Sequence, residues 1–410
     1  MRVRVTVHDI ARAANISRGT VHRALHNLPG VSQATREKVL SIAKHLDYKP
    51  YVPARVLATQ RKLLISIVVP IDENEDPFWY GVKAGVYAIT PEIREVGMET
   101  QWVVPGHWDP GDQITLMEEL IDKRVDGIAI APVDPDDLRE VIDRAVDSGI
   151  PVVTFNTDAP KSKRICFVGQ DSLTAGRVAG ELMNEILGGE GEVLIITGFH
   201  KTLGHQQRLQ GFKEQIQKYS PGVDIIGVYE NHNKPEKAYE ISQRVLRSCP
   251  ELGGIYITAG GAFGAGQAVK NAGKDGVVKL ICFDLFKETI QLIREGIVQI
   301  SIQQDPFFQG YESIRILYKY LLINHHPPEE YAFTNLTVAC RGNIEVLARQ
   351  YSKNLRMVDS HLLEKVSCSE RRKSPGVRDR PQKYSEDYIE IPDSIKRRDK
   401  RRVRENTPII

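Results

Sequence analysis

Residues 6–27 read TVHDIARAANISRGTVHRALHN. This stretch predicts two short helices joined by a tight turn, because Asn15 favours the left-handed conformation that ends a helix and Ser17 can cap the next one. The second helix presents Arg18 and Arg23 on its outer face. A cationic helix start held against a partner helix is typical of helix-turn-helix proteins that enter the DNA major groove. The alternative is a pair of amphipathic helices that belongs to an ordinary core.

The next run, VSQATREKVLSIAKHLDYKP (residues 31–50), predicts a third helix capped by Ser32. Its apolar side chains recur at helical spacing: Val39, Ile42, Ala43 and Leu46. Residues 1–50 contain nine Lys or Arg against three acidic residues. An excess of positive charge on a small helical unit favours binding to a polyanion such as DNA.

The motifs VTVHDIARAANIS, TV.R, VS..TREKV and Y.P occur in this order within the first 50 residues. They resemble the N-terminal signature of the lactose-repressor and galactose-repressor family of bacterial transcription regulators. The resemblance implies an all-α DNA-binding head at residues 1–50 and a hinge at residues 51–62. It also implies that Leu57 of the hinge wedges into the DNA minor groove, which bends the duplex. The alternative for the hinge is a plain linker.

The same resemblance assigns DNA contacts within the head. Arg18, Gly19 and Arg23 match family positions that face bases, and an arginine can bridge O6 and N7 of guanine. Other residues are placed to meet phosphates, which position the head without specifying sequence: Thr6, Ser17, Thr20, His22 and Arg36. His22 replaces a small hydroxyl residue that is common in the family, and a place on the helix surface without a DNA contact is its alternative.

The chain has 410 residues, of which 41% are hydrophobic, and a net charge of +2. The first 60 and the last 60 residues are basic, so the middle is mildly acidic, which suits a domain for a small molecule. The start lacks the apolar core of a signal peptide, and no stretch has the roughly 18 apolar residues of a membrane helix. We therefore expect a cytoplasmic protein with no membrane partner.

Five scattered cysteines predict reduced thiols, buried at Cys166, Cys282 and Cys340.

From Leu63 onward, apolar runs alternate with helical stretches. The predicted strands are LLISIVVP, TQWVVP, GIAIAPV and PVVTF, followed by ICFVG, EVLIITG, VDIIGVY, GGIYITA, VKLICFD and IVQISIQ. Strands that alternate with helices form parallel sheets covered on both faces. About 280 residues are too many for one sheet, so we predict two doubly wound α/β lobes.

This middle region, residues 63–345, resembles the ribose-type periplasmic sugar-binding proteins and the effector domains of the same repressor family. The resemblance implies a two-lobed domain, periplasmic-binding-protein type I-like, in which the chain crosses between lobes near Val168, Gln304 and Tyr331. The expected boundaries are residues 63–168 and 305–331 for the first lobe, and 169–304 and 332–345 for the second.

Ligands of such lobes bind at the carboxyl ends of the strands. Phe78 and Trp79, in a DPFW motif that resembles NPFF of ribose-type binders, are expected to stack on a sugar ring; a core position at a helix start is the alternative. Further matches lie at strand ends or helix starts: Asn156, Thr157, Gln170, Asp171, Arg208, Asp284 and Gln304. For Arg208 and Asp284 the alternative is a structural ion pair or cap. The run TAGGAFGAG (258–266) predicts a tight turn that opens a helix and leaves room for a larger ligand.

The C-terminal region, residues 346–410, predicts an amphipathic helix followed by a charged, disordered tail. From Ile344 to Val366 the apolar spacing fits either self-association or packing against the chain's own domain. Neither a catalytic motif nor a metal-ligand spacing is present, so we expect no enzyme, cofactor or metal site, and His200, His205, His325 and His326 are expected in surface loops.

The sequence thus predicts a DNA-binding transcription regulator, a repressor, that a sugar or polyol controls allosterically. Its expected partners are a pseudo-palindromic operator, the carbohydrate effector and a second copy of the chain, with a tetramer as the alternative. The rival interpretation is a sugar-binding receptor, or a sugar-modifying enzyme, with an accessory N-terminal domain.

Overall fold

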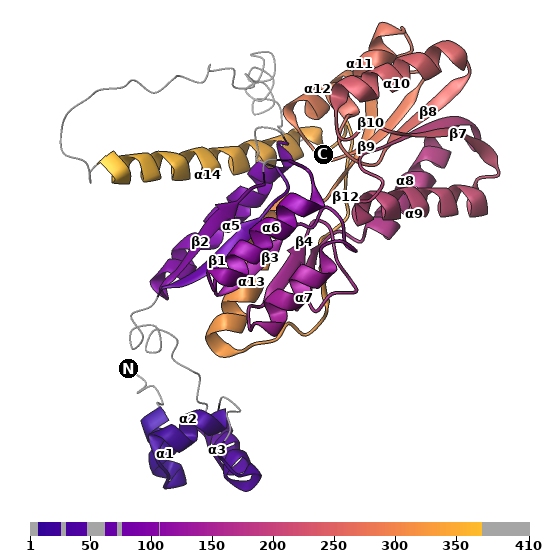
Figure 1. Cartoon of the computed structure of the whole chain (residues 1–410). Coiled ribbons are helices and arrows are strands. Elements are labelled where there is room, and N and C mark those ends of the chain that lie inside the picture. Colours follow the sequence, from indigo (N-terminus) through magenta and orange to yellow (C-terminus); the bar gives the residue numbers. More distant parts are fainter. Residues whose placement is uncertain (1–6, 26–29, 47–61, 72–75, 106, 371–410) are drawn as a thin grey trace, which may run out of the picture. The chain divides into compact units, whose positions relative to one another are not determined.

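A computed structural model describes residues 7–25, 30–46, 62–71, 76–105 and 107–370 (Figure 1). The predictions for Thr6, for most of the hinge with Leu57, and for the tail after Glu370 lie outside these residues. No helix in the described ranges is both long and apolar enough to cross a membrane.

The N-terminal unit consists of three helices, α1 (Val7–Ala14), α2 (Arg18–Leu25) and α3 (Gln33–His45). Ile10, Val21 and Val39, one from each helix, are completely buried in a shared core. Asn15 has a φ of 56°, as predicted for the residue that ends α1. Ser17 accepts a hydrogen bond from the Thr20 backbone N–H at 3.1 Å and so caps α2. The helix-turn-helix prediction is confirmed.

The rest of the described chain is built around two six-stranded sheets. The first has the strand order β11-β5-β4-β3-β1-β2 and the second the order β12-β10-β9-β8-β6-β7. Every strand pair is parallel except β10 with β12. The first sheet contains β1 (Leu63–Val68), β2 (Met98–Val103), β3 (Gly127–Ile130), β4 (Val152–Phe155), β5 (Cys166–Gly169) and β11 (Tyr331–Phe333). The second contains β6 (Glu190–Thr197), β7 (Gly222–Glu230), β8 (Leu252–Ile257), β9 (Lys279–Phe283), β10 (Val298–Gln303) and β12 (Thr337–Ala339).

Helices cover both faces of each sheet, so each lobe has two apolar cores. In the first lobe, α5 (Phe78–Glu95) and α13 (Pro306–Ile323) cover one face, and α6 (Pro110–Asp122) and α7 (Arg139–Asp147) the other. The second lobe has α8 (Ser172–Leu187) and α9 (Leu203–Tyr219) on one face. Its other face carries α10 (Pro235–Ser248), α11 (Ala262–Asn271) and α12 (Lys287–Glu295). The predicted two-lobed, doubly wound fold is confirmed.

The chain passes between the sheets three times. It leaves the first sheet after Gly169, returns between β10 and α13, and leaves again between β11 and β12. The last crossing differs from the prediction near Tyr331, because Ala332 and Phe333 still pair with Val168 and Gly169 of β5. The first lobe therefore extends to Phe333, and the second resumes after it.

The long helix α14 (Ile344–Glu370) begins at Ile344, the residue at which the predicted apolar spacing also begins. Ile344 and Ala348 are buried in a core of the second lobe, whereas Val358 is completely buried in a core of the first. Through Val358, the helix thus packs against the chain's own domain and contacts both lobes.

Four cysteines in the described ranges are free thiols. Cys166 and Cys282 are buried as predicted, but Cys340 is partly exposed because it follows the short edge strand β12.

Candidate functional site

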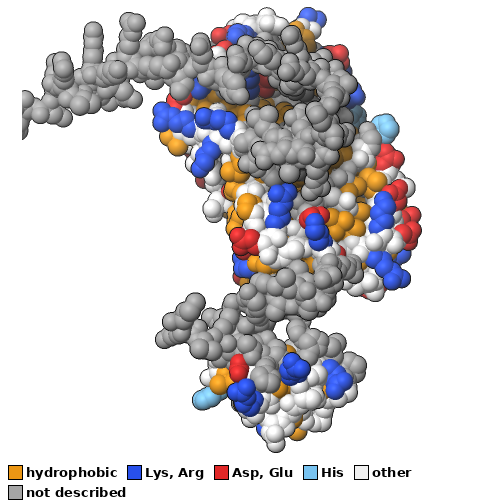
Figure 2. Space-filling model, turned by 90° about the vertical axis from the view of Figure 1, so that its left-hand side faces the viewer, with side chains coloured by type: hydrophobic (Ala, Val, Ile, Leu, Met, Phe, Trp, Pro, Cys, Tyr) orange, Lys and Arg blue, Asp and Glu red, His pale blue; other side chains and the backbone are white. Residues whose placement is uncertain are grey.

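The exposed side chains of α2 form the candidate surface of the head. Arg18, Gly19 and Arg23 are all exposed, and Figure 2 shows Lys and Arg side chains on the face of the head turned to the viewer. Ser17 and Thr20 lie at the start of α2, where their hydroxyl groups are 2.9 Å apart. A helix N-terminus with exposed hydroxyls and arginines presents donors to phosphates and base edges.

Two cations of α3 contact the ends of the other helices instead of standing free. Arg36 donates to the carbonyl of Ala24 at 3.3 Å, and Lys38 donates to the carbonyl of Ala14 at 3.0 Å. Cations near helix C-termini satisfy unpaired carbonyls and stabilise the helix dipole. These side chains therefore hold α1 and α2 in place against α3.

In the lobes, several predicted ligand residues follow the last residue of a strand. Asn156 lies after β4, Asp284 after β9 and Gln304 after β10. Asn156 and Asp284 have φ angles of 62° and 63°, a region that Asn and Asp tolerate better than other side chains. Such backbone conformations concentrate at ligand sites, where they turn a side chain into a cleft.

A hydrogen-bond network links these residues across the two lobes. Gln304 Nε2 donates to Asp284 Oδ2 at 2.6 Å, and Asn156 Nδ2 contacts Gln304 Oε1 at 3.4 Å. Arg208, buried on α9, donates to the carbonyl of Thr258 at 2.9 Å. Its guanidinium lies 4.0 Å from the ring centroid of Phe283. The network fixes the side chains before any ligand arrives.

Three polar atoms of this cluster are buried without a hydrogen-bond partner: Asp284 Oδ1, Arg208 Nε and Trp79 Nε1. Burying an unpaired polar group costs about 1–3 kcal/mol, so a ligand that hydrogen-bonds to these atoms would remove that cost. Burial also raises the pKa of Asp284 to about 6, although Arg208 and Gln304 oppose the shift. Trp79, Arg208 and Asp284 line one cavity, and their one acceptor and two donors suit a molecule that carries several hydroxyl groups.

These residues surround a cavity of about 50 Å³, which we call the inner chamber. Seven of the predicted ligand residues line it: Phe78, Trp79, Asn156, Thr157, Arg208, Asp284 and Gln304. Asp171 does not line it. The Asp171 carboxylate instead accepts hydrogen bonds from the backbone N–H and the hydroxyl of Thr174, and so caps α8. Gln170 also lies outside the lining, but its Oε1 is 3.4 Å from Arg208 Nη2.

Known proteins resemble both parts of the chain. The family model "Bacterial regulatory proteins, lacI family" matches residues 6–51, and that of the periplasmic binding protein domain matches residues 65–324, more than half of the chain. The chain belongs to the lacI family of bacterial regulatory proteins. It is therefore a DNA-binding transcription regulator whose larger part is a periplasmic-binding-protein domain.

The relatives of this lacI-family chain fall into two groups. The D-ribose/D-allose-binding protein of Pseudomonas aeruginosa is 31% identical over 66% of the chain and 86% of the relative. The transcriptional regulator DegA of Bacillus subtilis is 26% identical over 60% of the chain and 72% of the relative. Among solved structures, a solute-binding protein of Burkholderia graminis in complex with D-arabinose matches with a TM-score of 0.65 and 26% identity, covering 69% of this chain and 97% of that one.

Several residues of the inner chamber in this lacI-family protein did not emerge as candidates from the sequence: Asp76, Trp108, Gly204, His205, Asn233 and Phe286. Asp76 begins the DPFW motif, and burial raises its pKa to about 6. His205 precedes Arg208 by three residues on α9, a spacing that places both on one helix face and could have revealed it. Trp108 lies in a loop before α6 and gave no such signal.

The prediction that His205 lies in a surface loop is wrong, because it belongs to α9 and faces the inner chamber. Burial lowers its pKa to about 3, with a further lowering by Arg208. Its Nδ1 lies 3.0 Å from the backbone nitrogen of Phe199 and 3.2 Å from the carbonyl oxygen of the same residue. The lowered pKa keeps the ring neutral at neutral pH.

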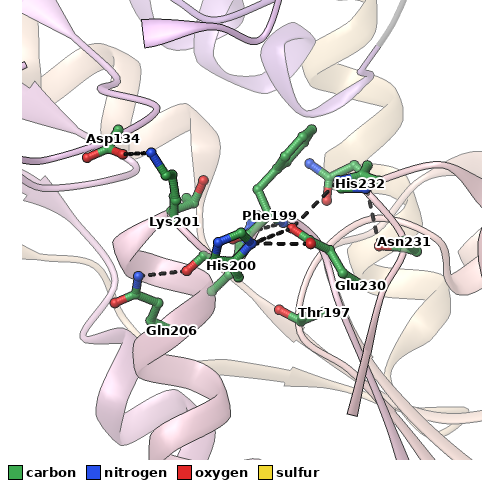
Figure 3. A network of polar contacts seen from close by, with 12 residues as sticks. Asp134, Thr197, Phe199, His200, Lys201, Gln206, Glu230, Asn231 and His232 are labelled. Carbon is green, nitrogen blue, oxygen red and sulfur yellow. Dashed lines mark hydrogen bonds and ion pairs between the residues drawn. The ribbon is translucent and has the colours of Figure 1, made fainter. Parts of the chain in front are cut away.

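The loop between β6 and α9 joins the two lobes beside the inner chamber (Figure 3). Phe199 stacks on Trp108 of the first lobe, with ring centroids 4.8 Å apart and planes 5° apart. Lys201 Nζ lies 3.4 Å from Asp134 Oδ2, and Thr202 donates to the Val133 carbonyl at 3.2 Å. These three contacts fix the loop against the first lobe.

A second set of contacts holds the same loop within its own lobe (Figure 3). His200 Nδ1 lies 3.1 Å from Glu230 Oε1, and Gln206 donates to the His200 carbonyl at 2.6 Å. Burial raises the pKa of Glu230, but the hydrogen bonds from the His200 backbone and ring outweigh it and lower the net value. Among the described residues, no three His, Cys, Asp or Glu side chains form a group that could hold a metal ion.

Proposed function

We propose that a sugar or polyol bound in the inner chamber controls the affinity of this regulator for its operator. The observation that carries the proposal is the set of buried, unpaired polar atoms on Asp284, Arg208 and Trp79. Bidentate hydrogen bonding by a carboxylate and a guanidinium, next to aromatic faces, suits a ring with an apolar C–H face and hydroxyl groups. The sugars bound by several relatives support this choice of ligand class.

In this proposal the residues that line the inner chamber share the ligand. Asp284 accepts from two ligand hydroxyls, Arg208 and Asn156 donate, Gln304 orients Asp284, and Trp79 or Phe78 supports the ring. Thr157 completes the set, whereas Asp171 has no ligand contact in the proposal because it caps α8. On the DNA side, the base-facing residues are Arg18, Gly19 and Arg23, the phosphate contacts are Thr6, Ser17, Thr20, His22 and Arg36, and Leu57 enters the minor groove.

The mechanism follows from the distribution of these residues over the lobes. Trp79 and Asn156 belong to the first lobe, and Arg208 and Asp284 to the second, so a ligand that contacts all four favours one lobe arrangement. That arrangement decides whether two heads of a dimer fit a pseudo-palindromic operator. Coupling of this kind is reciprocal and typically amounts to about 1–3 kcal/mol.

Four further features belong to the proposal. The regulator acts as a repressor, it works in the cytoplasm, it binds DNA as a homodimer, and it catalyses no reaction. The rival functions are a sugar receptor and a sugar-modifying enzyme, and they differ in measurable ways. A turnover assay with candidate sugars detects the enzyme, and a salt-dependent preference for particular duplexes is expected of the regulator alone.

The deciding experiment is a thermal-shift screen of the full chain with monosaccharides and polyols. A ligand present at 100 times its Kd stabilises the fold by about 2.7 kcal/mol. Each hit is then added to a complex of the protein with its operator, selected from random duplexes. A hit should change operator affinity, and Asp284→Asn should remove both effects. If hits stabilise the protein without changing DNA affinity, allosteric control is refuted.

A further inference from the structure

The inner chamber opens into a much larger cavity of about 760 Å³, which we call the outer chamber. Six residues line both: Asp76, Trp108, Asn233, Ala259, Gly260 and Phe286. At about 50 Å³ the inner chamber has room for only a few waters, whereas the outer one falls within the range of roughly 300–1,000 Å³ typical of ligand pockets. A ligand that reaches Arg208 and Asp284 must therefore extend into the outer chamber.

The outer chamber is built mainly by the second lobe. Its walls come from the loop after β7 (residues 232–235), the turn after β8 (259–263) and the segment after β9 (283–289). The turn itself requires glycine, because Gly261 has a φ of 115° and a Cβ on it would lie 2.2 Å from Asn231 Nδ2. The shape of this part of the wall therefore depends on Gly261.

The space is more than a gap between separated lobes. Beside it, Phe199 stacks on Trp108, and Lys201 and Thr202 contact Asp134 and Val133 of the first lobe. The lobes therefore already touch along one side of the chamber. His232, whose ring centroid is 5.3 Å from that of Phe199, continues this wall (Figure 3).

The chemistry of the walls points to a second ring. Phe263 and Phe286 line the chamber, and Phe263 is 43% exposed although it is a large apolar residue. Lys234, Lys237 and Glu288 provide polar ends around these aromatic faces. Flat apolar surfaces bordered by long polar side chains suit a ring with C–H faces and hydroxyl edges.

We propose that the effector is a two-ring glycoside, such as a disaccharide, with one ring held by Arg208 and Asp284 and the other against Phe263 and Phe286. This inference rests on the proposed function, because it extends the same sugar site outward. It assigns the two chambers different tasks: the inner chamber recognises hydroxyl groups and the outer chamber recognises the presence of a second ring.

The test is calorimetric titration of the full chain. The probes are D-glucose, D-galactose, D-ribose and D-allose, the phenyl glycosides of each in both anomers, and maltose, cellobiose and lactose. We expect a two-ring probe to bind at least about 10-fold more tightly than its parent monosaccharide. Phe263→Ala should weaken the two-ring probe by about 3- to 10-fold, the effect of one aromatic contact, and leave the monosaccharide unchanged. Tyr219→Ala removes an exposed aromatic side chain of α9 that lines neither chamber; it is the matched control and should change neither affinity.

Three results would overturn the inference. In the first, a monosaccharide binds at least as tightly as every two-ring probe derived from it and still changes operator affinity. The proposed function would then hold, but the proposal of a second ring would be wrong. In the second, Phe263→Ala weakens both kinds of probe equally. In the third, glucose 6-phosphate, titrated as an additional probe, binds most tightly and Lys237→Ala removes that advantage, which would make the outer chamber a phosphate site. If no saccharide binds at all, the proposed function fails together with the inference.

Discussion

The head and the cleft place their functional residues in opposite ways. In the head, Arg18 and Arg23 lie exposed on one eight-residue helix, with no partner needed to define them. In the cleft, Trp79, Arg208 and Asp284 come from three segments spread over about 200 residues of the sequence and are buried or partly buried. A surface that meets DNA can be encoded locally, whereas a site that surrounds a small molecule must be assembled from both lobes.

The sharpest test of this contrast removes one ligand contact from the cleft and leaves the head unchanged. Arg208→Ala deletes a buried donor and should weaken ligand binding by about 100-fold or more, since hydrogen bonds to charged groups contribute about 1.5–3 kcal/mol each. Calorimetry with the best probe measures this loss. Operator affinity without ligand should stay within about twofold of wild type. If Arg208→Ala weakened ligand binding and operator binding alike, the head and the cleft would not act as separate sites.

A second test uses pH. The pKa of Asp284 is raised from 3.8 to about 6, so the folded protein without ligand holds this proton more tightly than the unfolded chain. The group is therefore most favourable to folding below about pH 3.8, and that stability is lost as the pH rises through about 6. Asp284→Asn should unfold at higher urea than wild type at pH 7.5, by about 2–3 kcal/mol, and this advantage should fall by about half at pH 5.

The buried Asp284 carboxyl thus lowers the stability of the free protein but provides the charged acceptor for the ligand. Ligand binding by the asparagine variant is the control for the second role. The asparagine variant, although more stable, should bind the ligand poorly at both pH values because it lacks the charged acceptor. A pH-independent difference in urea midpoints would show that the Asp284 carboxyl is not the titrating group.

A third test concerns the packing that positions Arg208. Gly176 of α8 lies so close to α9 that a Cβ would sit 2.2 Å from the Arg208 carbonyl oxygen. Gly176→Ala should force α8 and α9 apart, cost about 1–3 kcal/mol in urea unfolding and weaken ligand binding. Glu181→Ala, at an exposed position of α8, is the matched control. Base preference in the head should be unchanged, because α8 has no part in it.

A fourth test addresses the head alone. Arg18→Ala should reduce discrimination between operator and mutant operator by about 10-fold, the size of one lost base contact. Lys38→Ala should instead weaken binding to all duplexes alike, because Lys38 holds the end of α1. Competition titrations with single-base operator variants distinguish the two, and uniform losses for Arg18→Ala would contradict its role in reading bases.

The smallest effect is expected at the loop that joins the lobes. The Lys201–Asp134 ion pair is 63% exposed on the lysine side, so Lys201→Ala should change stability by less than about 1 kcal/mol. Because the pair connects the lobes, the variant should still shift ligand affinity measurably, and this shift should shrink at high salt. A shift that does not respond to salt would exclude the charge interaction as its cause.

The cleft also shows where prediction from sequence failed. Phe78, Arg208 and Asp284 could be found because each lies in a motif or at a strand end. Trp108 could not, since its loop carries no periodicity and its partner Phe199 is 91 residues away. Asp171 was expected to face the ligand, yet it caps α8, because Asp at a helix start serves both roles equally well in a sequence.

The sequence by itself determined the three helices of the head and the alternation of strands and helices, because helix caps and apolar periodicity are local properties. It also determined the left-handed turn at Asn15 and the glycine turn before α11. Only the tertiary structure decided that α14 packs against both lobes, that His205 is half-buried and neutral beside Arg208, and that an outer chamber adjoins the inner one. Those features depend on contacts between distant segments, whose distances and burial no local pattern specifies.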